Sequence, residues 1–241
     1  MIPLALALDP DTLAMLPLWF VVFLLSLTVH EASHALVAMW GGDPTAYHGG
    51  QVTLDPRPHI RREPFGTIAV PIISYLLSGW MMGWASAPYD PHWQDRHPKR
   101  AALMALAGPL GNVALILVAA AAIRVGMLAG IFHPPESAGF THIVSAAPGS
   151  ILEPVATFLS IMFCLNLLLA AFNMLPVPPL DGITAIGLVL KEDSARKVAL
   201  IGRNPSYTFV GILIAWKIFD YVFDPVFLLG LRLLYPGVAY G

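Results

Sequence analysis

The stretch that decides the fold is residues 13–39, LAMLPLWFVVFLLSLTVHEASHALVAM. It is long enough to cross a bilayer as one helix, since a membrane span needs about 20 predominantly apolar residues. Only His30, Glu31 and His34 in this stretch are ionisable. Ionisable side chains at membrane depth are costly and are usually present for function. The stretch therefore predicts a membrane-spanning helix that carries a chemical site.

The three ionisable residues form the pattern His-Glu-x-x-His at residues 30–34. On a helix, the two imidazoles lie on one face about one turn apart. Two such nitrogens can share a tetrahedral Zn²⁺, and the neighbouring carboxylate can take a proton from water at the metal. A satisfied core histidine could explain one of these residues, but not all three at ligand spacing. The pattern predicts a zinc site with His30 and His34 as ligands and Glu31 as the general base.

The composition of the chain indicates a polytopic membrane protein. Of its 241 residues, 57% are hydrophobic and only 12% are charged, whereas soluble domains average about 25% charged residues. The net charge of −2 gives no sign of nucleic-acid binding. The single cysteine, Cys164, excludes an internal disulfide and a zinc site built mainly from cysteines. The N-terminus lacks the positive region of a signal peptide, so the first long helix is expected to stay inserted.

The apolar segments predict an all-α fold with about four transmembrane helices, in one integral-membrane domain over residues 1–241. The last of these segments contains Asp220 and Asp224-Pro225, so it is expected to kink or end near residue 223. Between the first two spans, Gly49-Gly50 followed by QVTL predicts a turn and a short membrane-associated β-strand at 51–54. The predicted spans are residues 12–40, 100–130, 151–176 and 206–235.

A further apolar segment, residues 65–84, is shorter and is interrupted by Pro71, Gly79 and Gly83. Lys and Arg are present in the loops on both sides of it, 41–64 and 85–100, and absent from 131–150. The positive-inside rule places both flanking loops in the cytoplasm. Segment 65–84 must then enter and leave on the same side, which predicts a re-entrant element.

The third metal ligand is predicted to be Asp181, in the run NMLPVPPLDG at 173–182. The prolines stop the preceding helix and release an irregular backbone that can aim a carboxylate into the bundle, and Gly182 permits the turn. If 65–84 is re-entrant, Asp181 returns to the same cytoplasmic half as His34. The alternative is that Asp181 merely caps a helix over 183–190.

Three motifs together resemble the site-2 protease family of intramembrane zinc metalloproteases. They are HEASH at 30–34, AGPLGN at 107–112 and NMLPVPPLDG at 173–182, in this order along the chain. The stretch 41–67 and the run GWASAPYDP at 83–91 resemble the short prokaryotic members that lack a PDZ domain. The resemblance covers most of residues 28–190.

The resemblance implies cleavage of a peptide bond in or near the transmembrane helix of a membrane-anchored protein substrate. It implies one Zn²⁺ per chain, bound by His30, His34 and Asp181, with Glu31 as general base. Asn173 and Asn112 become candidates for holding the substrate backbone or the oxyanion, although a buried asparagine such as Asn112 is more often a packing hydrogen bond. The implied location is a bacterial or archaeal plasma membrane, with the active site in its cytoplasmic half. Strand 51–54 is expected to pair with the unwound substrate.

Two other classes of protein share some of these features. A metal transporter would account for the histidines and Asp181, but it does not require Glu31 between them, and the internal repeats common in transporters are not found. A catalytically silent scaffold that binds single-span partners would be expected to have lost Glu31 or a ligand. Nothing in the sequence specifies an oligomeric state.

Overall fold

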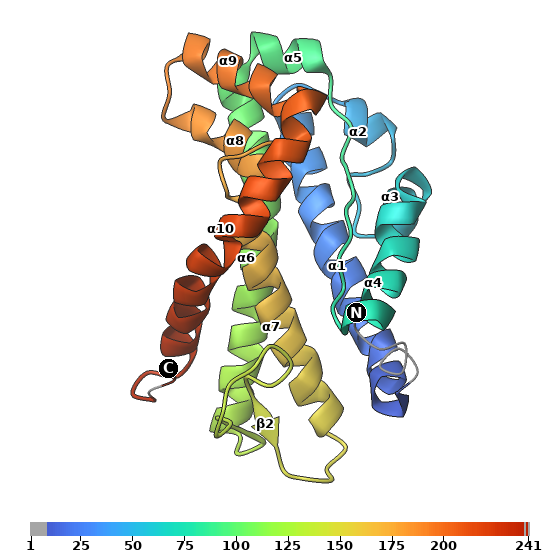
Figure 1. Cartoon of the computed structure of the whole chain (residues 1–241), viewed down its shortest axis with the longest axis vertical. Helices are drawn as coiled ribbons and strands as arrows, with labels where there is room; N and C mark the ends of the chain where they lie inside the picture. Colours follow the sequence, from blue (N-terminus) through green and yellow to red (C-terminus); the bar gives the residue numbers. More distant parts are fainter. Residues whose placement is uncertain (1–8, 239, 241) are drawn as a thin grey trace.

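Three long apolar helices form the centre of the molecule in the computed structural model, which describes residues 9–238 and 240 (Figure 1). Their packed faces carry the main hydrophobic core, which includes Trp19, Phe23, Ile123 and Phe163. Each helix is long and apolar enough to cross a membrane, so three of the four predicted spans are confirmed as helices of spanning length. They are α1 (Pro10–Trp40), α6 (Pro98–Leu128) and α7 (Glu153–Asn173).

The fourth predicted span corresponds to helix α10 (Pro205–Leu234), which lies against α7 (Figure 1). The helix continues through Pro225 and does not end near residue 223. It is not among the helices apolar enough to count as spans in the described part of the chain. The charged side chains of Lys217, Asp220 and Asp224 lower its hydropathy, and its crossing of the membrane stays a prediction.

The apolar segment after the first span forms a π-helical turn, η2 (Phe65–Ala69), continued by α4 (Val70–Ser78). At 1.5 Å per residue it is roughly 21 Å long, shorter than the hydrocarbon core of about 30 Å. It ends at Gly79, whose left-handed φ of 70° suits a residue without a side chain. The following residues, 81–90, contain no helix or strand and run back alongside α1 as a drawn-out chain (Figure 1).

The predicted β-strand at residues 51–54 is wrong. These residues form bends, and no strand is present anywhere in 41–97, all of which the structure describes. Local hydrogen bonds satisfy this backbone instead: Gln51 N–H donates to the Ala46 carbonyl, and Asp55 N–H donates to Thr53 Oγ1. The antiparallel pair of strands that does form, β1 (Phe132–His133) and β2 (Ser145–Ala146), connects α6 to α7.

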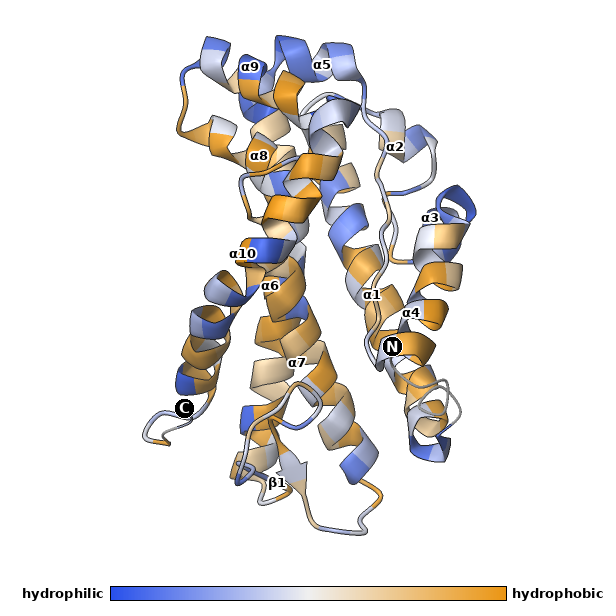
Figure 2. Cartoon of the chain, viewed as in Figure 1, coloured by the Kyte–Doolittle hydropathy of each residue, from blue (hydrophilic) through white to orange (hydrophobic). Residues whose placement is uncertain are grey.

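Most of the shorter helices gather at one end of the molecule, where hydrophilic residues are concentrated, whereas α3 lies beside α1 and leads into η2 and α4 (Figure 2). Asp55 and Asp90 begin two of them by accepting hydrogen bonds from the backbone N–H groups of Arg57 and His92. These helices are α2 (Thr45–His48), α3 (Pro56–Arg62), α5 (Pro91–Arg96), α8 (Asp181–Ala185), the 3₁₀ turn η3 (Ile186–Leu188) and α9 (Glu192–Gly202).

Candidate metal centre

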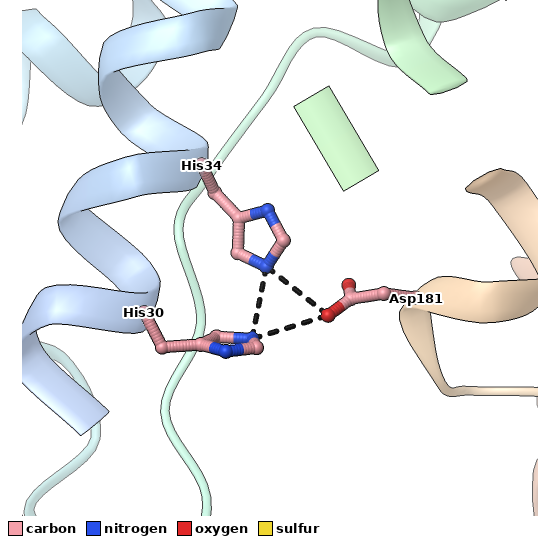
Figure 3. A group of neighbouring side chains, drawn as sticks. All are labelled: His30, His34 and Asp181. Carbon is pink, nitrogen blue, oxygen red and sulfur yellow. Dashed lines mark hydrogen bonds and ion pairs between the residues drawn. The ribbon is translucent and has the colours of Figure 1, made fainter. Parts of the chain in front are cut away.

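His30, His34 and Asp181 converge on one point between α1 and α8 (Figure 3). The two Nε2 atoms are 3.0 Å apart, and Asp181 Oδ2 lies 3.1 Å from that of His30 and 3.3 Å from that of His34. Ligand atoms that surround a tetrahedral Zn²⁺ at 2.0–2.1 Å are separated by roughly 3.3 Å. The spacing of the three atoms therefore fits such an ion.

The other ring nitrogen of each histidine is already hydrogen-bonded. His30 Nδ1 donates to Asn112 Oδ1 at 2.7 Å, and His34 Nδ1 donates to the Met104 carbonyl, also at 2.7 Å. With Nδ1 protonated, the Nε2 atom of a neutral imidazole presents a bare lone pair, the form that binds a metal.

The three converging atoms are all electron-pair donors and need a cation between them. Two Nε2 lone pairs and a carboxylate oxygen face one another, and Asp181 Oδ2 is buried without accepting a hydrogen bond from any of the described residues. The two histidines are 5% and 7% exposed, so water does not screen this repulsion. Three buried acceptors in mutual contact are the arrangement that a metal ion satisfies, and the residues present fit Zn²⁺.

Asp181 reaches the histidines because the proline-rich run ends α7 at Asn173 and turns the chain back (Figure 1). It is the first residue of α8, with Leu180 at the capping position, and its carboxylate points to the histidines. The alternative of a capping aspartate is therefore not observed. Gly182 serves a close approach, since a Cβ there would lie 2.5 Å from the Leu175 carbonyl oxygen.

Gly108, in the AGPLGN motif, leaves room for the centre. A Cβ at this position would lie 2.6 Å from His30 Nε2 and would also clash with His34 Nε2. Any side chain would therefore displace the ligand atoms. The motif contributes both this empty space and Asn112, at positions 108 and 112 of the same helix.

A cleft of about 610 Å³ opens beside the three converging residues. Glu31, 5% exposed, lines it together with the histidines, and so does Asn173 of α7. Tyr89 also lines the cleft, and burial raises the pKa of its hydroxyl above the ordinary value. The remaining walls are largely apolar and come from the extended segment 83–89, α7 and α10.

The predicted site residues thus have three different placements. Glu31 and Asn173 lie at the cleft, where Asn173 Nδ2 donates to the Leu169 carbonyl. Asn112 is fully buried behind His30 and does not line the cleft. His59, although buried, does not line the cleft, and its Nε2 lies 3.2 Å from the Thr53 carbonyl oxygen.

Sequence reasoning missed the wall formed by segment 83–89 and by Trp216 of α10. This segment lacks the alternation of apolar and polar residues that would predict a strand. Hydrogen bonds to residues distant in the sequence hold it in place. Asp43 Oδ2 accepts from Asp90 N–H at 2.7 Å, and Trp84 N–H donates to the Gly66 carbonyl. In the sequence, Asp43 directly follows Gly41-Gly42, and the structure shows that it is buried. This acidic residue after two glycines was the sequence feature that indicated an anchor for the segment.

Comparison with known proteins gives a consistent picture. The sequence pattern of Peptidase family M50 matches residues 18–215. The chain is 31% identical over 203 residues to YwhC of Bacillus subtilis, described as a candidate zinc metalloprotease, with 84% of this chain and 81% of that protein covered. It is 30% identical over 177 residues to Rip2 of Mycobacterium tuberculosis, described in the same way, with 73% and 59% covered. No solved structure matches significantly.

Proposed function

This chain belongs to peptidase family M50 and is a metalloprotease, and we propose that it cleaves a peptide bond in or near the transmembrane helix of a membrane-anchored protein. The observation that carries the proposal is the position of the metal centre. Its two histidines lie within an apolar helix of spanning length, and a cleft with largely apolar walls opens beside them. A site of this kind suits a polypeptide that is itself apolar.

Each residue of the site has a role in the proposed reaction. His30, His34 and Asp181 would hold one Zn²⁺. The bound ion would act as a Lewis acid, polarising the scissile carbonyl and making water more acidic. Glu31 accepts the proton of the attacking water and returns it to the leaving amine. Asn173 Nδ2 offers a hydrogen-bond donor to the substrate backbone or to the developing oxyanion.

The substrate must expose its carbonyls, and an intact helix keeps them in its own hydrogen bonds. We infer that the unwound substrate pairs with segment 83–89, in place of the strand expected at 51–54. This segment is extended and lines the cleft, and within the described chain the N–H groups of Ala85 and Ala87 have no hydrogen-bond partner. Addition of a strand would satisfy them. Ala87→Pro should lower cleavage and spare zinc binding, whereas Ala87→Ser should change neither.

The proposed setting is the plasma membrane of a prokaryote, with one integral-membrane domain over the whole chain. The hydrophilic end, which contains α5 and α9, would face the cytoplasm because Lys and Arg are concentrated there. His34 is six residues from the end of α1, about 9 Å along its axis, so the centre lies in the cytoplasmic half. Segment 65–84 would be re-entrant and α10 would be the fourth span.

The test pairs zinc stoichiometry with cleavage of a model single-span substrate in detergent, for wild type and Glu31→Gln. We expect one zinc per chain in both proteins, with cleavage only in wild type. Removal of a general base lowers rates by about 10² to 10⁴. Cleavage by Glu31→Gln at the wild-type rate would contradict the assigned base, and absence of zinc from the wild type would contradict the ligand set.

A further inference from the structure

A chain of hydrogen bonds runs from His30 away from the cleft into the centre of the helical bundle. Asn112 Oδ1 accepts from His30, and Asn112 Nδ2 donates to Asn166 Oδ1 at 2.8 Å. Asn166 Nδ2 donates to Ser26 Oγ at 2.9 Å and to the Met162 carbonyl at 2.7 Å. The chain links α1, α6 and α7, and beyond Asn112 none of its contacts involves a proposed metal ligand.

The direction of this chain is fixed at its far end. Ser26 Oγ donates its single hydrogen to the Val22 carbonyl at 2.7 Å, so toward Asn166 it can only accept. The Met162 carbonyl is also only an acceptor. Both therefore face the NH₂ group of Asn166, which leaves its Oδ1 toward Asn112.

The orientation of the Asn166 amide in turn determines that of the Asn112 amide, which contacts the metal ligand His30. Asn112 must present its NH₂ group to Asn166 Oδ1, and the same group also donates a longer hydrogen bond, 3.4 Å, to the Ser26 carbonyl oxygen. Its own Oδ1 therefore faces His30 and requires hydrogen on Nδ1. If the Asn112 amide were reversed, its NH₂ group would face Nδ1 and the neutral imidazole would carry hydrogen on Nε2, the atom that faces Asp181. That tautomer cannot bind a metal through Nε2.

We propose that Asn166 and Ser26 are positioning residues that fix the metal-binding tautomer of His30 through Asn112. All three polar side chains in this relay are fully buried, at 0% exposure, so no water can replace a missing partner. Residues in such outer shells orient a histidine ligand, and their loss typically lowers metal affinity by about 10- to 100-fold. The inference rests on the proposed zinc site and is independent of the proposed substrate.

The test measures zinc affinity by competition with a chelator for Asn166→Leu in two backgrounds. With Asn112 present, we expect a roughly tenfold weaker affinity, because only the long hydrogen bond to the Ser26 carbonyl oxygen then orients the Asn112 amide. With Asn112→Asp, we expect Asn166→Leu to change affinity by less than about threefold, because a carboxylate accepts from His30 Nδ1 with either oxygen.

Ser160→Ala is the matched control, because Ser160 is equally buried on α7 and its hydroxyl accepts from Ile143 N–H. It should lower the thermal stability of the metal-free protein without weakening zinc binding. An equal loss of affinity from Asn166→Leu in both backgrounds, or no loss in either, would overturn the proposed positioning role while leaving the zinc site intact. Absence of zinc from the wild type would overturn the proposed function together with it.

Discussion

Two clusters of histidine and acidic residues lie at opposite ends of the central helices, and only one is built to hold a metal. The inner cluster is His30, His34 and Asp181. The outer cluster, His133, His142 and Glu153, lines a cavity of about 400 Å³ beside the two-stranded sheet. Among the described residues, only the inner three bring ligand atoms within 4.8 Å of one another.

The difference lies in which partners their polar atoms already have. In the outer cluster, His142 Nε2 is 3.0 Å from Ser145 Oγ, and Glu153 Oε1 accepts from Gly149 N–H. Neighbours along the chain thus engage one polar atom each of His142 and Glu153, and all three side chains of the outer cluster are exposed to solvent. In the inner cluster, partners on other helices occupy Nδ1 and leave Nε2 free. Residue type alone therefore does not make a metal site.

The largest effect on zinc binding and cleavage is expected when a ligand of the inner cluster is removed. Asp181→Asn should abolish stoichiometric zinc and reduce cleavage to background, because a neutral amide replaces the one anionic ligand. His142→Asn at the outer end is the control and should retain one zinc per chain. Zinc analysis of both purified proteins checks this. A full zinc complement in Asp181→Asn would remove Asp181 from the ligand set.

The next test adds a single carbon at the inner centre. Gly108→Ala should weaken zinc binding by roughly a hundredfold, because the new methyl group would meet both Nε2 atoms. Gly111→Ala, on the same helix, would place a Cβ 2.5 Å from the Ser33 hydroxyl, which can rotate away. Chelator competition should show a near-normal affinity for that control. Equal affinities in the two variants would contradict the close approach at Gly108.

A smaller effect is expected where the fold holds the Asp181 segment in place. The Lys99 ammonium donates to the carbonyl oxygens of Gly187, Leu188 and Leu190, just after α8. Hydrogen bonds of charged groups contribute about 1.5–3 kcal/mol when fully formed, and Lys99 is half-buried, so Lys99→Met should weaken zinc binding by about tenfold or less. Lys191→Met, at an exposed lysine of the same region, should not. An unchanged affinity in Lys99→Met would show that this anchor does not position Asp181.

The smallest effect is expected at the outer cluster itself. Glu153→Gln keeps an amide oxygen that can accept from Gly149 N–H, so we expect cleavage and zinc affinity to change by less than about threefold. Surface substitutions of this kind usually alter stability by within about 0.5 kcal/mol. Thermal unfolding and the chelator assay check both quantities. Loss of zinc from Glu153→Gln would mean that the two ends are not functionally separate.

The sequence by itself determined the elements whose signal is local. Apolar length predicts the three central helices, the spacing of His30 and His34 places two imidazoles on one helical face, and prolines end α7 before Asp181. Each of these depends on residues within a few turns of one another, where helical periodicity and the missing proline N–H act directly.

Only the tertiary structure decided how these parts meet. The strand expected at 51–54 is absent because local side chains and turns satisfy that backbone, while the extended wall at 83–89 depends on anchors at Asp43 and Gly66. Asn112 was predicted as a possible substrate contact, yet packing places it behind His30, oriented by Asn166. An amide has no preferred orientation until its partners on other helices are in place, so the tautomer of a metal ligand is fixed by packing and not by local sequence.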